Sequence, residues 1–164
     1  MKTVYDVLVV DDSESSRDLI LNALNNDKFI KNSCRVDFKE NYREAIQWLD
    51  ENKNNFDILI SDLYFYGNPK GFDICKVGRE MNVNAHIILI TSQAREDINP
   101  DILARSSIDS VCERSEENYL DNLIDNLHEF IRNKEKSIEE KTTFLQKIMD
   151  NKYMNSIKWI INKI

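Results

Sequence analysis

Residues 4–20 read VYDVLVVDDSESSRDLI, and this stretch decides the fold. An apolar run over 5–10 ends in two adjacent aspartates, after which Ser13 has the residue type and position of a helix N-cap. Similar apolar runs follow at 56–61 and 86–91. Uninterrupted runs of Val, Ile and Leu of this length are typical of strands buried on both faces, as in a parallel sheet.

Further strands are predicted at 34–38 and around 110–112, and amphipathic stretches between the runs predict helices. Asn41 with Glu44 resembles a capping box, and Asn99-Pro100 places proline at a first helical position. Ser115 is expected to open a last helix with apolar residues at helical spacing. Five strands alternating with five helices predict a doubly wound α/β domain.

Composition excludes several classes of site. Three glycines cannot form a Gly-rich nucleotide loop, and two distant histidines cannot form a zinc cage. Three cysteines without a CxxC pattern indicate reduced core residues. No apolar run approaches the roughly 18 residues of a membrane span, and the N-terminus lacks the apolar region of a signal peptide. We therefore expect a cytoplasmic protein.

Acidic side chains stand where the predicted strands end. Asp11 and Asp12 follow the first strand and Asp62 ends the third, while Thr91 and Arg114 lie at the ends of the fourth and fifth. The functional crevice of such sheets lies at the carboxyl ends of the strands. Converging carboxylates repel, and a Mg²⁺ ion among them would remove that repulsion. With a hydroxyl and a cation nearby, the pattern indicates phosphoryl transfer with Asp62 as the nucleophile.

Four segments together resemble the response-regulator receiver domain of two-component signalling. They are VYDVLVVDDSESSRDLI, FDILISDLYFYGNPKGFDICK, HIILITSQA and IDSVCERSE, and the resemblance spans residues 4–131. It implies a five-stranded parallel sheet in the order 2-1-3-4-5, the flavodoxin-like arrangement. We therefore predict a receiver domain over 1–131 and a helical C-terminal extension over 132–164.

The resemblance also implies a role for each site residue. Asp62 would accept a phosphoryl group from a histidine kinase or phosphotransfer protein. Asp11, Asp12, Asp62 and the backbone carbonyl of Tyr64 would bind Mg²⁺. Thr91 would move toward the phosphoryl group, and Arg114 stands where the family has a lysine. Chemistry at Asp62 would be limited to self-phosphorylation and autodephosphorylation, so no metabolic enzyme is expected.

Two departures from the family pattern keep an alternative open. Arg114 replaces a compact ammonium by a planar guanidinium, and Val111 stands at the usual aromatic switch position. Phe65-Tyr66 replaces the common Met-Pro. We expect the aromatic residues 64–66 to pack over the loop; the other arrangement is a cluster that faces a partner protein. The alternative is a degenerate receiver-like module that binds proteins or dimerises without phosphorylation.

Two rival classes with the same architecture fit less well. A flavodoxin-like electron carrier needs Ser, Thr and Gly around a phosphate in its first loop, where this chain has acidic DDSES. A phosphatase of the haloacid-dehalogenase type needs two aspartates separated by one residue after the first strand. The adjacent Asp11 and Asp12 do not match that spacing.

The charge of −7 is unevenly distributed along the chain. The formal charges of residues 132–164 sum to +4 and those of the other 131 residues, the body of the chain, to −11, which argues against nucleic-acid binding by the body.

In the C-terminal segment we expect a charged break at 132–137, a turn at 150–156 and an apolar stripe of Ile157, Ile160, Ile161 and Ile164. The stripe would dock on the chain's own body, on a second copy as a homodimer, or on a separate partner or anionic membrane. Signalling is expected through protein contacts of the last two helices and last strand of the receiver.

Overall fold

Five parallel strands form the sheet that the sequence predicts. The computed structural model describes residues 4–161, without the side chains of Arg95, Tyr153, Met154 and 157–161. The strands lie in the order β2-β1-β3-β4-β5, which confirms the predicted topology. Their bounds are β1 (Tyr5–Val10), β2 (Cys34–Lys39), β3 (Ile58–Asp62), β4 (His86–Thr91) and β5 (Ser110–Glu113). The predicted bounds differ from these by at most two residues.

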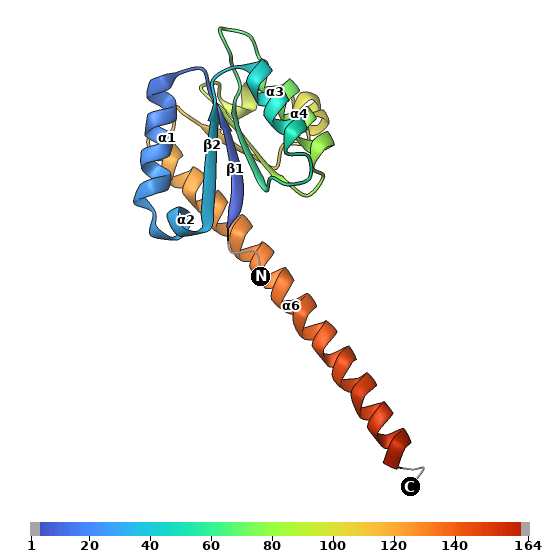
Figure 1. Cartoon of the computed structure of the whole chain (residues 1–164). Helices are drawn as coiled ribbons and strands as arrows, with labels where there is room; N and C mark the ends of the chain where they lie inside the picture. Colours follow the sequence, from blue (N-terminus) through green and yellow to red (C-terminus); the bar gives the residue numbers. More distant parts are fainter. Residues whose placement is uncertain (1–3, 162–164) are drawn as a thin grey trace. The chain divides into compact units, whose positions relative to one another are not determined.

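Four of the six α-helices in the described part of the chain begin at a residue whose side chain caps them. The six are α1 (Glu14–Asn26), α2 (Lys28–Ser33), α3 (Tyr42–Glu51), α4 (Gly71–Met81), α5 (Pro100–Arg105) and α6 (Tyr119–Ile161), with a short 3₁₀ helix η1 (Arg95–Asp97). The side chains of Ser13 and Asn41 cap α1 and α3, as predicted. Pro100 lies in the first turn of α5, as predicted, and the Asn99 side chain also caps that helix. In Figure 1, α1 lies on one face of the sheet, and α3 and α4 lie on the other.

Four sequence-based expectations about the helices are wrong: the number of helices, the start of the last one, and two interruptions within it. A short α2, capped by Asp27, was missed because its six residues are too few for a periodic pattern. The last helix begins at Tyr119, not Ser115. It continues through both the expected break at 132–137 and the expected turn at 150–156. No glycine or proline occurs after Pro100, and the Lys, Arg and Glu residues of the segment favour helix.

Successive side chains of each strand point to opposite faces of the sheet, so a buried core forms on each face. Leu8 and Val10 of β1 join Leu59 of β3 in one fully buried cluster with Ala45 and Leu49 of α3. The intervening strand residues are also buried and, by the period of two, face the layer that contains α1. Burial of both faces is the reason for the uninterrupted apolar runs. Cys75 and Cys112 are buried and Cys34 is half-buried; all three thiols are free.

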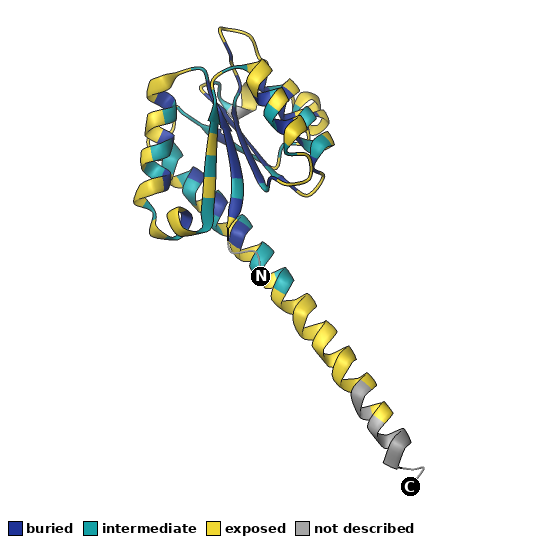
Figure 2. Cartoon of the chain, viewed as in Figure 1, coloured by how far each residue is buried: buried dark blue, intermediate teal, exposed yellow. Residues whose placement is uncertain are grey.

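The chain divides into two units, residues 2–128 and 129–164, which are described separately. The first contains the sheet and the beginning of α6, where Leu123 and Leu127 are buried. The second is helical over its described residues, 129–161, and its side chains from 139 to 152 are exposed (Figure 2). The predicted stripe at 157–161 lies outside the described side chains, and Ile164 lies outside the described residues. Among the described helices, none is long and apolar enough to cross a membrane.

Candidate functional site

Three carboxylates meet at the carboxyl ends of β1 and β3. Asp11 and Asp12 directly follow β1, and Asp62 is the last residue of β3. Each contributes an oxygen atom, and these oxygens lie within 4.8 Å of one another. β1 pairs with β2 on one side and with β3 on the other, so the cluster lies where the strand order reverses. Tertiary structure thus brings together the three aspartates that the sequence predicts at this edge.

Asp11 is the most firmly held of the three carboxylates. It is buried, and its Oδ1 accepts a hydrogen bond from the Ser13 amide at 2.9 Å. Its Oδ2 accepts one from Ser16 Oγ at 2.6 Å and another from Arg114 Nη2. The Arg17 guanidinium donates to its backbone carbonyl at 2.6 Å. These contacts fix the orientation of the Asp11 carboxylate before any ligand binds.

Asp62 has an altered acidity. Its Oδ1 accepts a hydrogen bond from Arg114 Nη2 and its Oδ2 one from the Tyr64 amide, both at 3.1 Å. Burial raises the pKa of Asp62 to about 6; the Asp11 charge adds to this effect, and the Arg114 charge opposes it. At neutral pH the carboxylate is mostly ionised but poorly solvated, a state in which a cation would stabilise it.

Arg114 points into the site. Its backbone amide donates to the Thr91 carbonyl at 2.7 Å, which continues the pairing of β4 and β5 by one residue. Its guanidinium donates to Asp11, Asp62 and Ser16. The basic residue that the sequence places after the fifth strand is therefore a neighbour of the predicted phospho-acceptor.

Thr91 and Tyr64 border the site without a hydrogen bond to each other. Thr91 is buried at the end of β4, and its hydroxyl oxygen accepts a hydrogen bond from the Gln93 amide at 3.0 Å. The Tyr64 hydroxyl donates to Gln93 Oε1 at 3.2 Å. The switch role of Thr91 and the metal role of the Tyr64 carbonyl stay predictions.

A tight hairpin after β3 is tied to Asp12. Phe65 and Asn68 exchange two backbone hydrogen bonds of 2.8 and 2.9 Å, and both intervening residues, Tyr66 and Gly67, have positive φ. This is the type I′ pattern of two-residue hairpins. The Tyr66 amide donates to Asp12 Oδ2 at 2.7 Å. Only Phe65 packs into the core; Tyr66 is 76% exposed, so the expectation that residues 64–66 all pack over the loop is wrong.

Sequence reasoning missed two residues that shape the site. Ser16 is buried in the first turn of α1 and contacts both Asp11 and Arg114. Gly71 begins α4 so close to β3 that a Cβ atom there would lie 2.1 Å from the Asp62 carbonyl oxygen. No local pattern marks either contact: Ser16 is one of three serines over 13–16, and Gly71 is a glycine at a helix start.

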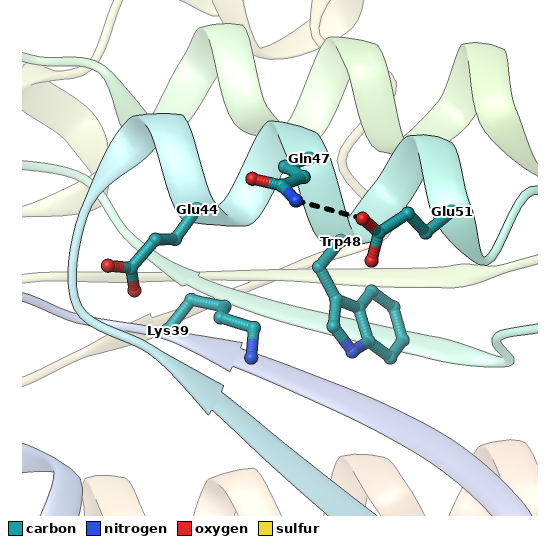
Figure 3. Close-up of a pocket in the computed structure, with 5 residues that line it drawn as sticks. All are labelled: Lys39, Glu44, Gln47, Trp48 and Glu51. Atoms are coloured by element: carbon teal, nitrogen blue, oxygen red, sulfur yellow. Dashed lines mark hydrogen bonds between the residues drawn. The ribbon is translucent and has the colours of Figure 1, made fainter.

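A separate polar hollow of about 230 Å³ lies between α3 and the end of β2 (Figure 3). It is lined by Lys39, Glu44, Gln47, Trp48 and Glu51. Gln47 Nε2 donates a hydrogen bond to Glu51 Oε1 at 2.9 Å, so these two polar side chains of the lining bond each other. None of the aspartates of the acidic cluster lines this hollow, so it is not part of the candidate site.

Comparison with known proteins agrees with the geometry. Residues 7–125 match the response regulator receiver domain family, and the chain belongs to that family. The fold is similar to a chemotaxis response regulator of Vibrio cholerae, with TM-score 0.62 and 21% identity over 78% of this chain and 99% of that one. A receiver domain protein of Clostridium thermocellum has TM-score 0.63 and 20% identity over 80% and 98% of the two chains. No curated protein sequence matches the chain.

Proposed function

We propose that this receiver accepts a phosphoryl group on Asp62, in a Mg²⁺-dependent transfer from a histidine kinase or phosphotransfer protein. The observation that carries the proposal is the Asp62 carboxylate itself. It ends the central strand, lies beside the oxygens of Asp11 and Asp12, and accepts a hydrogen bond from Arg114. A carboxylate in such surroundings can act as a nucleophile toward phosphorus.

In the proposed transfer, a carboxylate oxygen of Asp62 forms a bond to phosphorus while the phosphorus–nitrogen bond of the donor histidine breaks. The product is an acyl phosphate, and the proton needed by the departing imidazole comes from solvent. The Arg114 guanidinium and the Thr91 hydroxyl would then bind phosphoryl oxygens. Positioning and charge neutralisation supply most of the catalysis in reactions of this class.

The residues present fit a Mg²⁺ ion. Three carboxylates from two strand ends offer oxygens within 4.8 Å, and Mg²⁺ prefers a few carboxylates together with water and substrate oxygens. Asp11, Asp12, Asp62 and the Tyr64 carbonyl would hold it. Bound there, the ion would neutralise charge on the carboxylates and on the incoming phosphoryl group.

The direct test is incubation with Mg²⁺ and a small phosphodonor such as acetyl phosphate. The proposal expects a base-labile, hydroxylamine-sensitive adduct. A protein that binds Mg²⁺ but never forms the adduct would instead be the phosphorylation-independent binding module.

Mg²⁺ should raise the melting temperature of the wild type, and Asp12→Asn should remove most of that increase. Asparagine keeps an oxygen that can accept from the Tyr66 amide, so the hairpin stays anchored while the charge is lost. A ligand stabilises the folded state in proportion to ln(1 + [L]/Kd). Differential scanning fluorimetry over a Mg²⁺ series measures this effect. An unchanged Mg²⁺ response in Asp12→Asn would exclude Asp12 as a ligand.

The metal-free protein should lose stability between pH 4 and pH 7 relative to Asp62→Asn. The pKa of Asp62 rises from 3.8 to about 6 on folding, so the folded state binds the proton more tightly. The protonated Asp62 carboxyl therefore stabilises the folded state fully below pH 3.8, and this stabilisation is lost as the pH rises through about 6. We expect a relative loss of about 2 kcal/mol by urea unfolding in chelator. If the free energies of unfolding of the wild type and of Asp62→Asn changed in parallel with pH, the raised pKa of Asp62 would be contradicted.

Signalling by this receiver is proposed to run through protein–protein contacts. The surface formed by α5, β5 and the first turns of α6 is the candidate output face, and the acidic charge of the body argues against direct nucleic-acid binding. We place the protein in the cytoplasm, where thiols such as Cys34, Cys75 and Cys112 remain reduced.

A second copy of the chain is proposed to cover the exposed apolar residues of α6. Four described apolar side chains of α6 follow helical spacing and are 43–62% exposed: Phe144, Leu145, Ile148 and Met149. Two copies of this helix packed side by side would bury these residues against one another. Replacing Leu145 and Ile148 together by Gln should shift sedimentation from dimer to monomer, with Thr142→Gln as the control. A wild type that sediments as a monomer would refute the homodimer and favour docking on the body, a partner or a membrane.

A further inference from the structure

Ser16, Asp11 and Arg114 form a closed ring of hydrogen bonds at the edge of the acidic cluster. Ser16 Oγ donates to Asp11 Oδ2 at 2.6 Å and accepts from Arg114 Nη1, while Arg114 Nη2 donates to the same Asp11 oxygen. A hydroxyl has one donor and two acceptor positions, so Ser16 can make both bonds at once. Ser16 is 3% exposed, so water does not compete freely for its hydroxyl.

The ring determines where the guanidinium lies. A guanidinium is a rigid planar fork, so fixing Nη1 on Ser16 also fixes the direction of Nη2. That second nitrogen donates to Asp11 Oδ2 and to Asp62 Oδ1, at 3.1 Å for the latter. Arg114 thus contacts one oxygen of each of two carboxylates that belong to the candidate metal cluster.

We infer that Ser16 is a positioning residue that holds Arg114 as a built-in counter-ion of Asp11 and Asp62, in competition with Mg²⁺. This inference rests on the proposed function. Asp11 Oδ2 already accepts two hydrogen bonds, one of them from Arg114, so a divalent ion that uses this oxygen must displace a donor. At Asp62 Oδ1 the charge of the guanidinium repels an approaching ion. Loss of the Ser16 hydroxyl therefore frees the guanidinium to leave and makes the carboxylates easier for the ion to bind.

The first measurement concerns the metal-free protein and tests positioning alone. The ¹⁵N and ¹H resonances of the Arg114 guanidinium, recorded by NMR, should show slow proton exchange in the wild type. Ser16→Ala should give at least tenfold faster exchange. Ser15→Ala is the matched control, since that exposed hydroxyl lies in the same turn and contacts Ser13 rather than the site. Equal exchange rates in all three proteins would overturn the positioning role.

The second measurement is the Kd of Mg²⁺, obtained by calorimetry on the full chain. Ser16→Ala should bind Mg²⁺ about tenfold more tightly, as expected for losing one hydrogen bond to a charged group. Arg114→Gln should bind it at least as tightly as Ser16→Ala. In the Arg114→Gln background, Ser16→Ala should change nothing further, because Ser16 acts through Arg114.

The outcomes separate this inference from the proposed function. Unchanged or weaker Mg²⁺ binding in Ser16→Ala or Arg114→Gln would overturn the competition. If Ser16→Ala changed the Kd of Mg²⁺ equally in the wild type and in Arg114→Gln, Ser16 would act on Asp11 directly, and the inference would also be overturned. Mg²⁺ binding by Arg114→Gln but not by the wild type would be its strongest support. If no variant binds Mg²⁺, the metal part of the proposed function fails together with the competition, while the exchange measurement still decides the positioning role.

Discussion

Asp62→Asn will abolish labelling of the protein by a small phosphodonor in the presence of Mg²⁺. The amide is nearly isosteric with the carboxylate but is not nucleophilic, so no acyl phosphate can form. The predicted effect is complete loss of the hydroxylamine-sensitive adduct, measured by intact-protein mass spectrometry.

The control for this variant is Asp73→Asn, which changes an exposed aspartate of α4 that pairs with Lys70 at the surface. It should be labelled like the wild type. Circular dichroism must show that Asp62→Asn remains folded. Folding is expected because an amide oxygen facing Arg114 can still accept its hydrogen bond at the Oδ1 position. Labelling that persists in Asp62→Asn would remove this residue as the phospho-acceptor.

Gly71→Ala will destabilise the fold by about 3–5 kcal/mol, the range of severe single substitutions. A Cβ atom at this position would lie 2.1 Å from the Asp62 carbonyl oxygen and 2.7 Å from Leu63 Cα, both backbone atoms that cannot rotate away. The start of α4 would have to move off β3, which breaks the hydrogen bond from the Gly71 amide to the Leu63 carbonyl. Urea unfolding followed by circular dichroism measures the loss.

Gly67→Ala, in the hairpin that precedes α4, is the matched control. Gly67 has φ of +78°, and no atom lies within 4 Å of its added Cβ position. The cost there is limited to the left-handed conformation, about 1–2 kcal/mol. A Gly71→Ala variant as stable as Gly67→Ala would show that close approach at residue 71 does not constrain α4.

The strands and the acidic cluster could be predicted because both follow from local patterns. Uninterrupted apolar runs mark strands buried on two faces, and the carboxyl ends of parallel strands share one edge of the sheet. Asp11, Asp12 and Asp62 were therefore expected at one edge of the sheet, and the pairing of β1 with β3 brings their oxygens within 4.8 Å of one another. The strand order itself followed from the family resemblance and agrees with the structure.

The unbroken C-terminal helix shows where local reasoning failed. A cluster of charges at 132–137 and a polar stretch at 150–156 suggested interruptions, but neither contains a glycine or proline. Charged and polar residues of these types are compatible with helix, so their presence alone does not end one. Polarity alone was therefore a poor guide to a helix boundary.

The sequence by itself determined the strands, several helix caps and the aspartates at the strand ends, because these depend on residue type and short spacing. Only the tertiary structure decided that Arg114 bonds Asp11 and Asp62 through a ring with Ser16, and that Gly71 lies against Asp62. Ser16 and Arg114 are 98 residues apart, and their side chains meet only after β1 and β5 have been placed in one sheet. Contacts of that kind depend on the packing of whole elements, which no local pattern records.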